Sequence, residues 1–295
     1  MSGVIAATAS YLIWAVAGSI LLRSIALPGP MIACLGFLVG AVVMFILILK
    51  ERAKEIRGAW REHWSLLLRL SVAFAGASIC YQSAVKMTTI ANATITQASQ
   101  AIITCVVFMP LVLRKRPSAY GLVALAVGLL GLGVLLGPQL AIPDSLRGIW
   151  GIILGLASAA FFAWFNVLAP RMEGKMPHEV AIAFLLAFSF VISLPFALFS
   201  LGSTVSLNVA AVEWAICLGL ANAVCILLYY YALQQTAMER VTALSYLEPP
   251  AAIGTAAIFL GEPIGAATIV GGIIVLAASA LAVFGEKFKT LFHHR

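Results

Sequence analysis

The segment from Val241 to Ala282 reads VTALSYLEPPAAIGTAAIFLGEPIGAATIVGGIIVLAASALA, and it contains nearly all of two apolar runs, 241–260 and 264–284. Each run has the length, about 20 residues, that an α-helix needs to cross the hydrocarbon core of a bilayer. The first run carries one carboxylate, Glu248, followed directly by Pro249 and Pro250. The segment therefore predicts an interrupted transmembrane helix followed by a continuous one.

The rest of the chain continues this pattern. Eight further apolar runs of similar length lie at 3–22, 30–49, 65–85, 92–113, 119–136, 148–169, 179–201 and 212–233. The chain is 63% hydrophobic and 10% charged, whereas soluble domains are about 25% charged. The connections are short, and the longest polar one runs from Lys50 to Trp64. We therefore predict an all-α membrane protein with ten transmembrane helices.

The basic residues predict the orientation of these helices. With the N-terminus in the cytoplasm, fourteen of the 18 Lys and Arg residues fall on the cytoplasmic side, three (Arg23, Lys86 and Arg147) fall on the opposite side, and Arg69 lies just inside the third run. Cytoplasmic loops of membrane proteins carry such an excess. The distribution predicts that both termini are cytoplasmic, which requires an even number of spans, and it explains the net charge of +7 without nucleic acid.

The two halves of the sequence resemble each other weakly. Ala9-Ser10 aligns with Ala157-Ser158 at a shift of 148 residues, and Tyr81 aligns with Tyr231 at a shift of 150. Because five spans is an odd number, two such halves must have opposite orientations, as in many secondary transporters. We predict five-helix repeats over 1–140 and 146–295; the alternative is that apolar helices align through composition alone.

The run 92–113 is the most polar of the ten. Gln97, Gln100 and Thr104 share one face of the predicted helix. Polar groups inside a membrane usually face the bundle interior or a water-filled path. This stripe is a candidate for binding the amino or carboxylate group of a solute, and the alternative is that it forms hydrogen bonds between helices.

The run 241–260 carries the only carboxylate deep inside any span. Burial disfavours the charged form of a carboxyl group, so Glu248 is a candidate for proton coupling or for binding a substrate amine. The alternative is a structural carboxyl group that is either neutral or hydrogen-bonded to a neighbouring helix. Pro249 and Pro250 lack the N–H groups that would bond the carbonyls of Ser245 and Tyr246, so they predict a break and a hinge near the middle of the bilayer.

Aromatic and amide side chains within the apolar runs complete the predicted solute cavity. Aromatic rings suit amphipathic or cationic solutes, and mid-span Trp is less expected than Trp at the membrane interface. The candidate residues for the cavity, besides Gln97 and Gln100, are Trp14, Tyr81, Gln82, Trp164, Asn166, Tyr230 and Tyr231. For the tyrosines of the eighth run, an interfacial position is the alternative.

Several classes of function find no support in the sequence. No GxxxxGK[ST] phosphate loop, HExxH or GxSxG motif is present, and the four histidines lie in predicted loops or the tail. The five cysteines lie inside apolar runs without metal-ligand spacing. We therefore expect no catalytic residues, metal, cofactor or nucleic-acid partner. The expected partners are the lipid bilayer and a small-molecule substrate, and the protein is expected to be a monomer or weak dimer.

The stretch from Val241 to Ala282, with Leu-Glu-Pro, then Leu-Gly-Glu-Pro, then a glycine-rich span, resembles the EamA-type exporters of the drug/metabolite transporter superfamily. The first half carries a weaker copy, in which Arg116-Pro117 stands in place of Glu262-Pro263. The resemblance implies an inner-membrane carrier that works by alternating access. It also implies a central cavity lined by spans 1, 3, 4, 6, 8 and 9.

Family members commonly export amino acids or related metabolites, and some relatives carry nucleotide sugars or drugs. Together with the amide and aromatic residues, the resemblance predicts export of amino acids, including aromatic ones; nucleosides, sugars and amphipathic cationic drugs are the alternative substrates. A solute channel is an alternative of another class. A membrane enzyme acting on lipid-linked substrates would need a cluster of acidic or histidine residues, which the sequence lacks.

Overall fold

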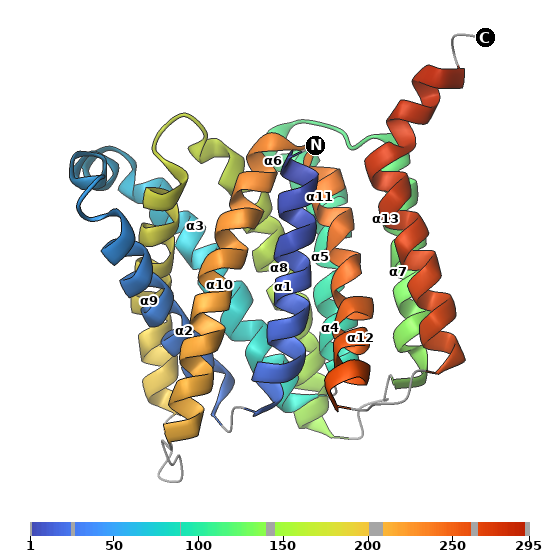
Figure 1. The fold of residues 1–295 in the computed structure, drawn as a ribbon, viewed down its shortest axis with the longest axis horizontal. Coiled ribbons are helices and arrows are strands. Elements are labelled where there is room, and N and C mark those ends of the chain that lie inside the picture. The colour runs from blue at the N-terminus through green and yellow to red at the C-terminus, as the bar shows by residue number, and fades with distance from the viewer. Residues whose placement is uncertain are drawn as a thin grey trace.

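The protein is described by a computed structural model that covers residues 2–24, 27–88, 90–139, 145–200, 209–260 and 265–292. Within these residues the chain forms helices and no strands, and the helices pack side by side in one bundle (Figure 1). Glu262, Pro263 and Arg295 lie outside the described residues.

The α-helices follow one another with short connections. Their bounds are α1 (Ser2–Ser24), α2 (Gly29–Ile48), α3 (Ala53–Met87), α4 (Ile90–Ala98), α5 (Gln100–Ile102), α6 (Met109–Leu113), α7 (Ala119–Leu136), α8 (Leu146–Leu168), α9 (His178–Ser200), α10 (Val209–Gln235), α11 (Met238–Leu244), α12 (Glu248–Leu260) and α13 (Ala266–Phe292). A π-helix, Ile103–Phe108, joins α5 to α6. Short 3₁₀ turns lie at Gly137–Gln139, Ala169–Met172 and Ser245–Leu247.

Seven helical segments of the described chain are long and apolar enough to cross a membrane. They are Gly29–Ile48, Ala53–Met87, Asn92–Leu113, Ala119–Leu136, Leu146–Met172, His178–Ser200 and Val212–Gln235. Two shorter apolar helices, Ser2–Ala17 and Ile269–Phe284, lie near the ends of the chain. The prediction of an all-helical, multi-pass membrane protein is confirmed.

One predicted connection is itself helical. The polar stretch from Lys50 to Trp64 was expected to link two spans, but α3 begins within it, at Ala53, and runs for 35 residues. The segment is amphipathic: Ala59 is buried, and the ring of Trp60 stacks on Phe184 with centroids 6.3 Å apart. The polar connection between the second and third runs is therefore mostly helical, and its apolar side packs against the bundle.

Two helical segments of the bundle are interrupted. The segment 90–113 changes from α4 through Ser99 and α5 into the π-helix and α6. The segment 238–260 is interrupted by the 3₁₀ turn Ser245–Leu247, directly before Pro249 and Pro250, as the prolines predicted. In a regular helix the carbonyl of Ser245 would accept from the N–H of residue 249, but Pro249 has none. This carbonyl accepts instead from the backbone N–H of Glu248.

The helices of the first half pack against those of the second. Helix α3 contacts α8 and α9, α2 contacts α9 and α10, α1 contacts α10 and α12, and α7 contacts α13. The α7–α13 pair lies at one edge of the bundle and contacts α11 (Figure 1). Gly271 brings these two helices so close that a Cβ at this position would overlap the backbone of Leu135.

Candidate functional site

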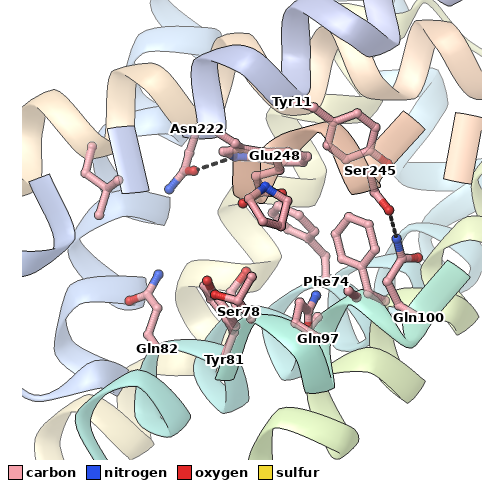
Figure 2. Close-up of a pocket in the computed structure, with 17 residues that line it drawn as sticks. Tyr11, Phe74, Ser78, Tyr81, Gln82, Gln97, Gln100, Asn222, Ser245 and Glu248 are labelled. Atoms are coloured by element: carbon pink, nitrogen blue, oxygen red, sulfur yellow. Dashed lines mark hydrogen bonds between the residues drawn. The ribbon is translucent and has the colours of Figure 1, made fainter. Parts of the chain in front are cut away.

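A cavity of about 150 Å³ lies in the centre of the bundle, between the two interrupted segments and their neighbours (Figure 2). Its lining comes from α1, α3, α4, α5, α8, α10, the 3₁₀ turn Ser245–Leu247 and α12. These correspond to spans 1, 3, 4, 6, 8 and 9, the set that the family resemblance implied. A cavity of this size has room for several waters or a small solute.

Among the described residues that line the cavity, Glu248 is the only acidic one, and none is Lys, Arg or His. It is the first residue of α12, so the break in the helix positions its side chain at the cavity wall. Among the residues that the structure describes, the Glu248 carboxyl group forms neither a hydrogen bond nor an ion pair. One of the two structural alternatives for Glu248, a hydrogen bond to a neighbouring helix, is therefore not observed among these residues.

Aromatic rings form one side of the cavity. Tyr11 and Trp14 of α1 have ring centroids 6.0 Å apart, and Trp14 lies 6.2 Å from Phe162 of α8 in an edge-to-face arrangement. Behind them, the buried ring of Tyr229 lies 5.5 Å from both Tyr11 and Phe162. Such contacts fix ring orientation, so the cavity presents rigid aromatic surface.

The indole of Trp14 is fixed by a hydrogen bond across the two halves. Its Nε1 donates to Oδ1 of Asn222 on α10, at 2.9 Å. Both side chains line the cavity. Because the indole N–H is a donor only, this bond uses its single polar group and leaves the face of the ring for an apolar contact.

A buried hydrogen-bond network adjoins the cavity and is centred on Asn166 of α8. Its Nδ2 donates to Oε1 of Gln100 at 2.9 Å and to Oγ1 of Thr104 at 3.0 Å, and its Oδ1 accepts from the hydroxyl of Tyr229 at 2.8 Å. Gln100 in turn donates to Oγ of Ser245 at 3.2 Å (Figure 2). The network thus connects both interrupted segments with α8 and α10.

The polar residues of the segment 90–113 fall into two groups: some line the cavity, and others form hydrogen bonds between helices. Gln97 lines the cavity without belonging to the network, Gln100 lines the cavity and also bonds to Asn166, and Thr104 is fully buried against Asn166. Two side-chain acceptors of the cavity lining, Oε1 of Gln97 and Oε1 of Gln82, are buried without a hydrogen-bond partner among the described residues. Buried acceptors in this position are satisfied by water or by a solute.

The structure brings seven of the predicted site residues to the cavity. They are Trp14, Tyr81, Gln82, Gln97, Gln100, Glu248 and Pro249. Asn166 lies behind the lining, within the network described above. Trp164 packs half-buried against the main core, and Pro250 lies outside the lining. Tyr230 and Tyr231 instead contact His178, at ring distances of 5.8 and 5.9 Å.

Other lining residues were not among the predicted site residues. Asn222 and Ser245 are polar positions inside apolar runs, so the criterion that selected Gln97 would also have selected them. Phe74, Phe162 and Leu218 gave no signal, because an apolar side chain is equally compatible with lipid, core or cavity. Within the described residues, no group of three or more His, Cys, Asp or Glu residues is placed to hold a metal ion.

An all-helical membrane bundle with a central polar and aromatic cavity defines a protein that handles a small solute within the bilayer. The chain belongs to the EamA-like transporter family, whose model matches residues 1–137 and again residues 149–284. The protein is therefore a multi-pass membrane transporter, and its partners include the lipid bilayer and a small-molecule substrate.

Individual relatives agree with this assignment. An uncharacterized transporter from Archaeoglobus fulgidus is 27% identical over 226 residues, which cover 75% of this chain and 78% of that protein. A protein of known crystal structure, 18% identical, matches 95% of this chain and 96% of its own with a TM-score of 0.81. At this identity the second match shows that the fold is shared.

Proposed function

We propose that this protein is a secondary transporter that exports amino acids, aromatic ones included, by alternating access. The observation that carries the proposal is the central cavity, which combines rigid aromatic surface, amide groups and one carboxyl group between the two halves of the chain. An amino acid offers a matching set of groups: an ammonium for a carboxylate, a carboxylate for amide and hydroxyl donors, and a side chain for the rings.

The proposal includes an architecture of ten spans in two inverted repeats, 1–140 and 146–295. Exchanging the halves would pair α1 with α8, α2 with α9, α3 with α10, the segment α4–α6 with α11–α12, and α7 with α13. Under this exchange the contact of α3 with α8 becomes that of α10 with α1. The contact of α4 with α8 becomes that of α12 with α1, and the contact of α2 with α10 becomes that of α9 with α3. All six contacts occur in the structure. The contacts of α2 with α9 and α7 with α13 map onto themselves. This correspondence supports a twofold relation between the halves.

Alternating access requires an element that changes shape between the two states. The break at Ser245–Leu247 and the adjacent Pro249 and Pro250 supply a place where backbone hydrogen bonds are already missing. We assign the hinge to Pro249 and Pro250, and proton coupling to Glu248. In this mechanism, movement of the hinge carries the Glu248 carboxyl group between the two sides of the membrane.

The protein is proposed to lie in the bacterial inner membrane with both termini in the cytoplasm. Helix α1 begins and helix α13 ends at the same side of the bundle (Figure 1). The basic residues that follow α2 and α6 belong to the cytoplasmic excess counted in the sequence. A cytoplasmic position for these residues follows from the positive-inside rule.

The test is efflux from proteoliposomes loaded with a mixture of amino acids. Selective, saturable loss of some amino acids is expected, and external substrate should exchange with internal substrate in counterflow. Flux that neither saturates nor shows counterflow would indicate a channel. Retention of every amino acid by folded, inserted protein would reject the amino-acid assignment, and nucleosides, sugars and cationic drugs would then be tested in the same vesicles.

Replacing Asn222 with leucine is expected to raise the KM for an aromatic amino acid about fivefold and to change kcat little. The substitution removes the acceptor for Trp14 Nε1, and one lost hydrogen bond corresponds to about 1 kcal/mol. The measurement is saturable efflux of phenylalanine. Val224→Ala, on the exposed face of the same helix, is the matched control. An unchanged KM in Asn222→Leu would show that the orientation of Trp14 does not affect binding.

A further inference from the structure

The formal charge on the described lining of the cavity comes from a carboxyl group and is therefore negative when that group is ionised. Of the described residues that line it, Glu248 is the only one with a formal charge, because none of them is Lys, Arg or His. In the described part of the chain its carboxyl group has no hydrogen-bond or ion-pair partner. A carboxylate removed from bulk water without a partner is costly. A cationic group that enters the cavity therefore gains a partner that the protein itself does not supply.

Three polar atoms of the lining are buried without a partner among the described residues: the Tyr11 hydroxyl, which can donate or accept, and two amide oxygens. Oε1 of Gln82 and Oε1 of Gln97 are buried acceptors without a partner among the described residues. Two of the donors in the lining are already used, because Trp14 Nε1 donates to Asn222 and Gln100 Nε2 donates to Ser245. The cavity thus offers unused acceptors to a solute that brings N–H donors.

These groups are distributed over two facing walls. Glu248 projects from the wall that also carries Tyr11 and Asn222, and Gln82, Tyr81 and Gln97 lie on the wall across the cavity (Figure 2). On the aromatic side, the ring centroid of Trp14 lies 6.0 Å from that of Tyr11 and 6.2 Å from that of Phe162. Aromatic faces attract cations and pack against apolar groups.

We propose that the cavity selects solutes that combine an ammonium group with an aromatic or apolar body, and that a carboxylate on the solute is dispensable. The inference rests on the proposed function, because it treats the cavity as the transport site. It goes further in naming the chemical feature that is recognised. An aromatic amine should bind at least as tightly as the amino acid of the same side chain, whereas the aromatic acid without the amine should be excluded.

The test is binding of radiolabelled phenethylamine to the purified protein in lipid nanodiscs. The competitors are phenethylamine, phenylalanine and 3-phenylpropanoate, which share a ring and differ in charged groups. We expect phenethylamine to compete as well as phenylalanine or better, and 3-phenylpropanoate to compete at least about tenfold less well. Equal competition by 3-phenylpropanoate and phenethylamine would overturn the proposal.

Glu248→Gln tests the residue itself. The variant is expected to lose at least about tenfold in affinity for phenethylamine, because it replaces a charge-assisted contact by a neutral one. Glu248→Asp keeps the charge and should recover part of the affinity. Glu213→Gln, at an exposed position of α10, is the matched control and should bind as the wild type does. Wild-type affinity in folded Glu248→Gln would reject the assignment.

The proposed transport of amino acids and the proposed selection for an ammonium group can be rejected by different results. If the wild type transports phenylalanine in proteoliposomes but phenethylamine neither binds nor competes, the ammonium selection is wrong and the proposed function stands. If the wild type transports no amino acid and no amine, the proposed function itself is wrong. Should Glu248→Gln fail to fold, as judged by size-exclusion chromatography, the competitor series on the wild type still decides the question.

Discussion

Replacing Asn166 with leucine is expected to destabilise the protein by about 2–4 kcal/mol, the larger of the stability effects that we anticipate. Leucine branches at the same carbon as asparagine and is somewhat bulkier, so the substitution removes the hydrogen bonds without opening a cavity. Asn166 is fully buried and bonds to Gln100, Thr104 and Tyr229. After the change, the Tyr229 hydroxyl and Gln100 Oε1 remain buried without their partner.

The magnitude follows from the number of bonds and their surroundings. A buried group left without a partner costs about 1–3 kcal/mol, whereas single hydrogen bonds between membrane helices average about 0.6 kcal/mol. For three bonds these figures become about 1.8 kcal/mol and about 3–9 kcal/mol, so the expected loss of about 2–4 kcal/mol lies towards the lower figure. The effect should be cooperative, because each member holds the next in position.

A double-mutant cycle with Tyr229→Phe tests this network. Thermal unfolding in detergent would be followed for the wild type, both single variants and Asn166→Leu/Tyr229→Phe. Tyr229→Phe alone should cost about 1 kcal/mol, and much less in the Asn166→Leu background, because the acceptor is already gone. Strict additivity, or a wild-type melting temperature for Asn166→Leu, would contradict a coupled network.

Much of the fold could be predicted from the sequence because the bilayer imposes a simple rule. Every backbone polar group in hydrocarbon must be bonded within the segment, so apolar runs of sufficient length become helices. The run predicted at 119–136 coincides with α7 (Ala119–Leu136). The break before Pro249 was predictable from the same rule, because proline removes a specific donor at a specific position.

The orientation of each helix about its own axis could not be predicted in the same way. Gln97 and Glu248 were recognisable because a polar side chain avoids lipid, and both line the cavity. Trp164 and Tyr230 carry no such constraint, since an aromatic ring is stable in a core, at a cavity or against lipid. The sequence places them in a span, and only packing against neighbouring helices decides which way they face.

Glu248→Gln is expected to abolish accumulation driven by a pH gradient, the largest functional effect that we anticipate. With the interior of the vesicles one pH unit more acidic than the outside, protons leave as solute enters. Exchange of one proton for one solute then supports an accumulation of about tenfold, because one pH unit corresponds to about 1.4 kcal/mol. Without a titratable group in the cavity the ratio should fall to one. The direction of the gradient fixes the sign: an acidic exterior should drive solute out of the wild-type vesicles.

The steady-state ratio is the appropriate measurement because it separates coupling from binding. Loss of the ammonium contact in Glu248→Gln slows transport, but a slower carrier that is still coupled reaches the same final ratio. The membrane potential would be clamped with potassium and valinomycin, so that only the pH gradient drives accumulation. Glu213→Gln should keep the tenfold ratio. A ratio of one in the wild type would identify a uniporter, and a tenfold ratio in Glu248→Gln would place proton coupling at another group. Because the described lining contains no other acidic residue, that second outcome would also move the coupling step out of this part of the solute cavity.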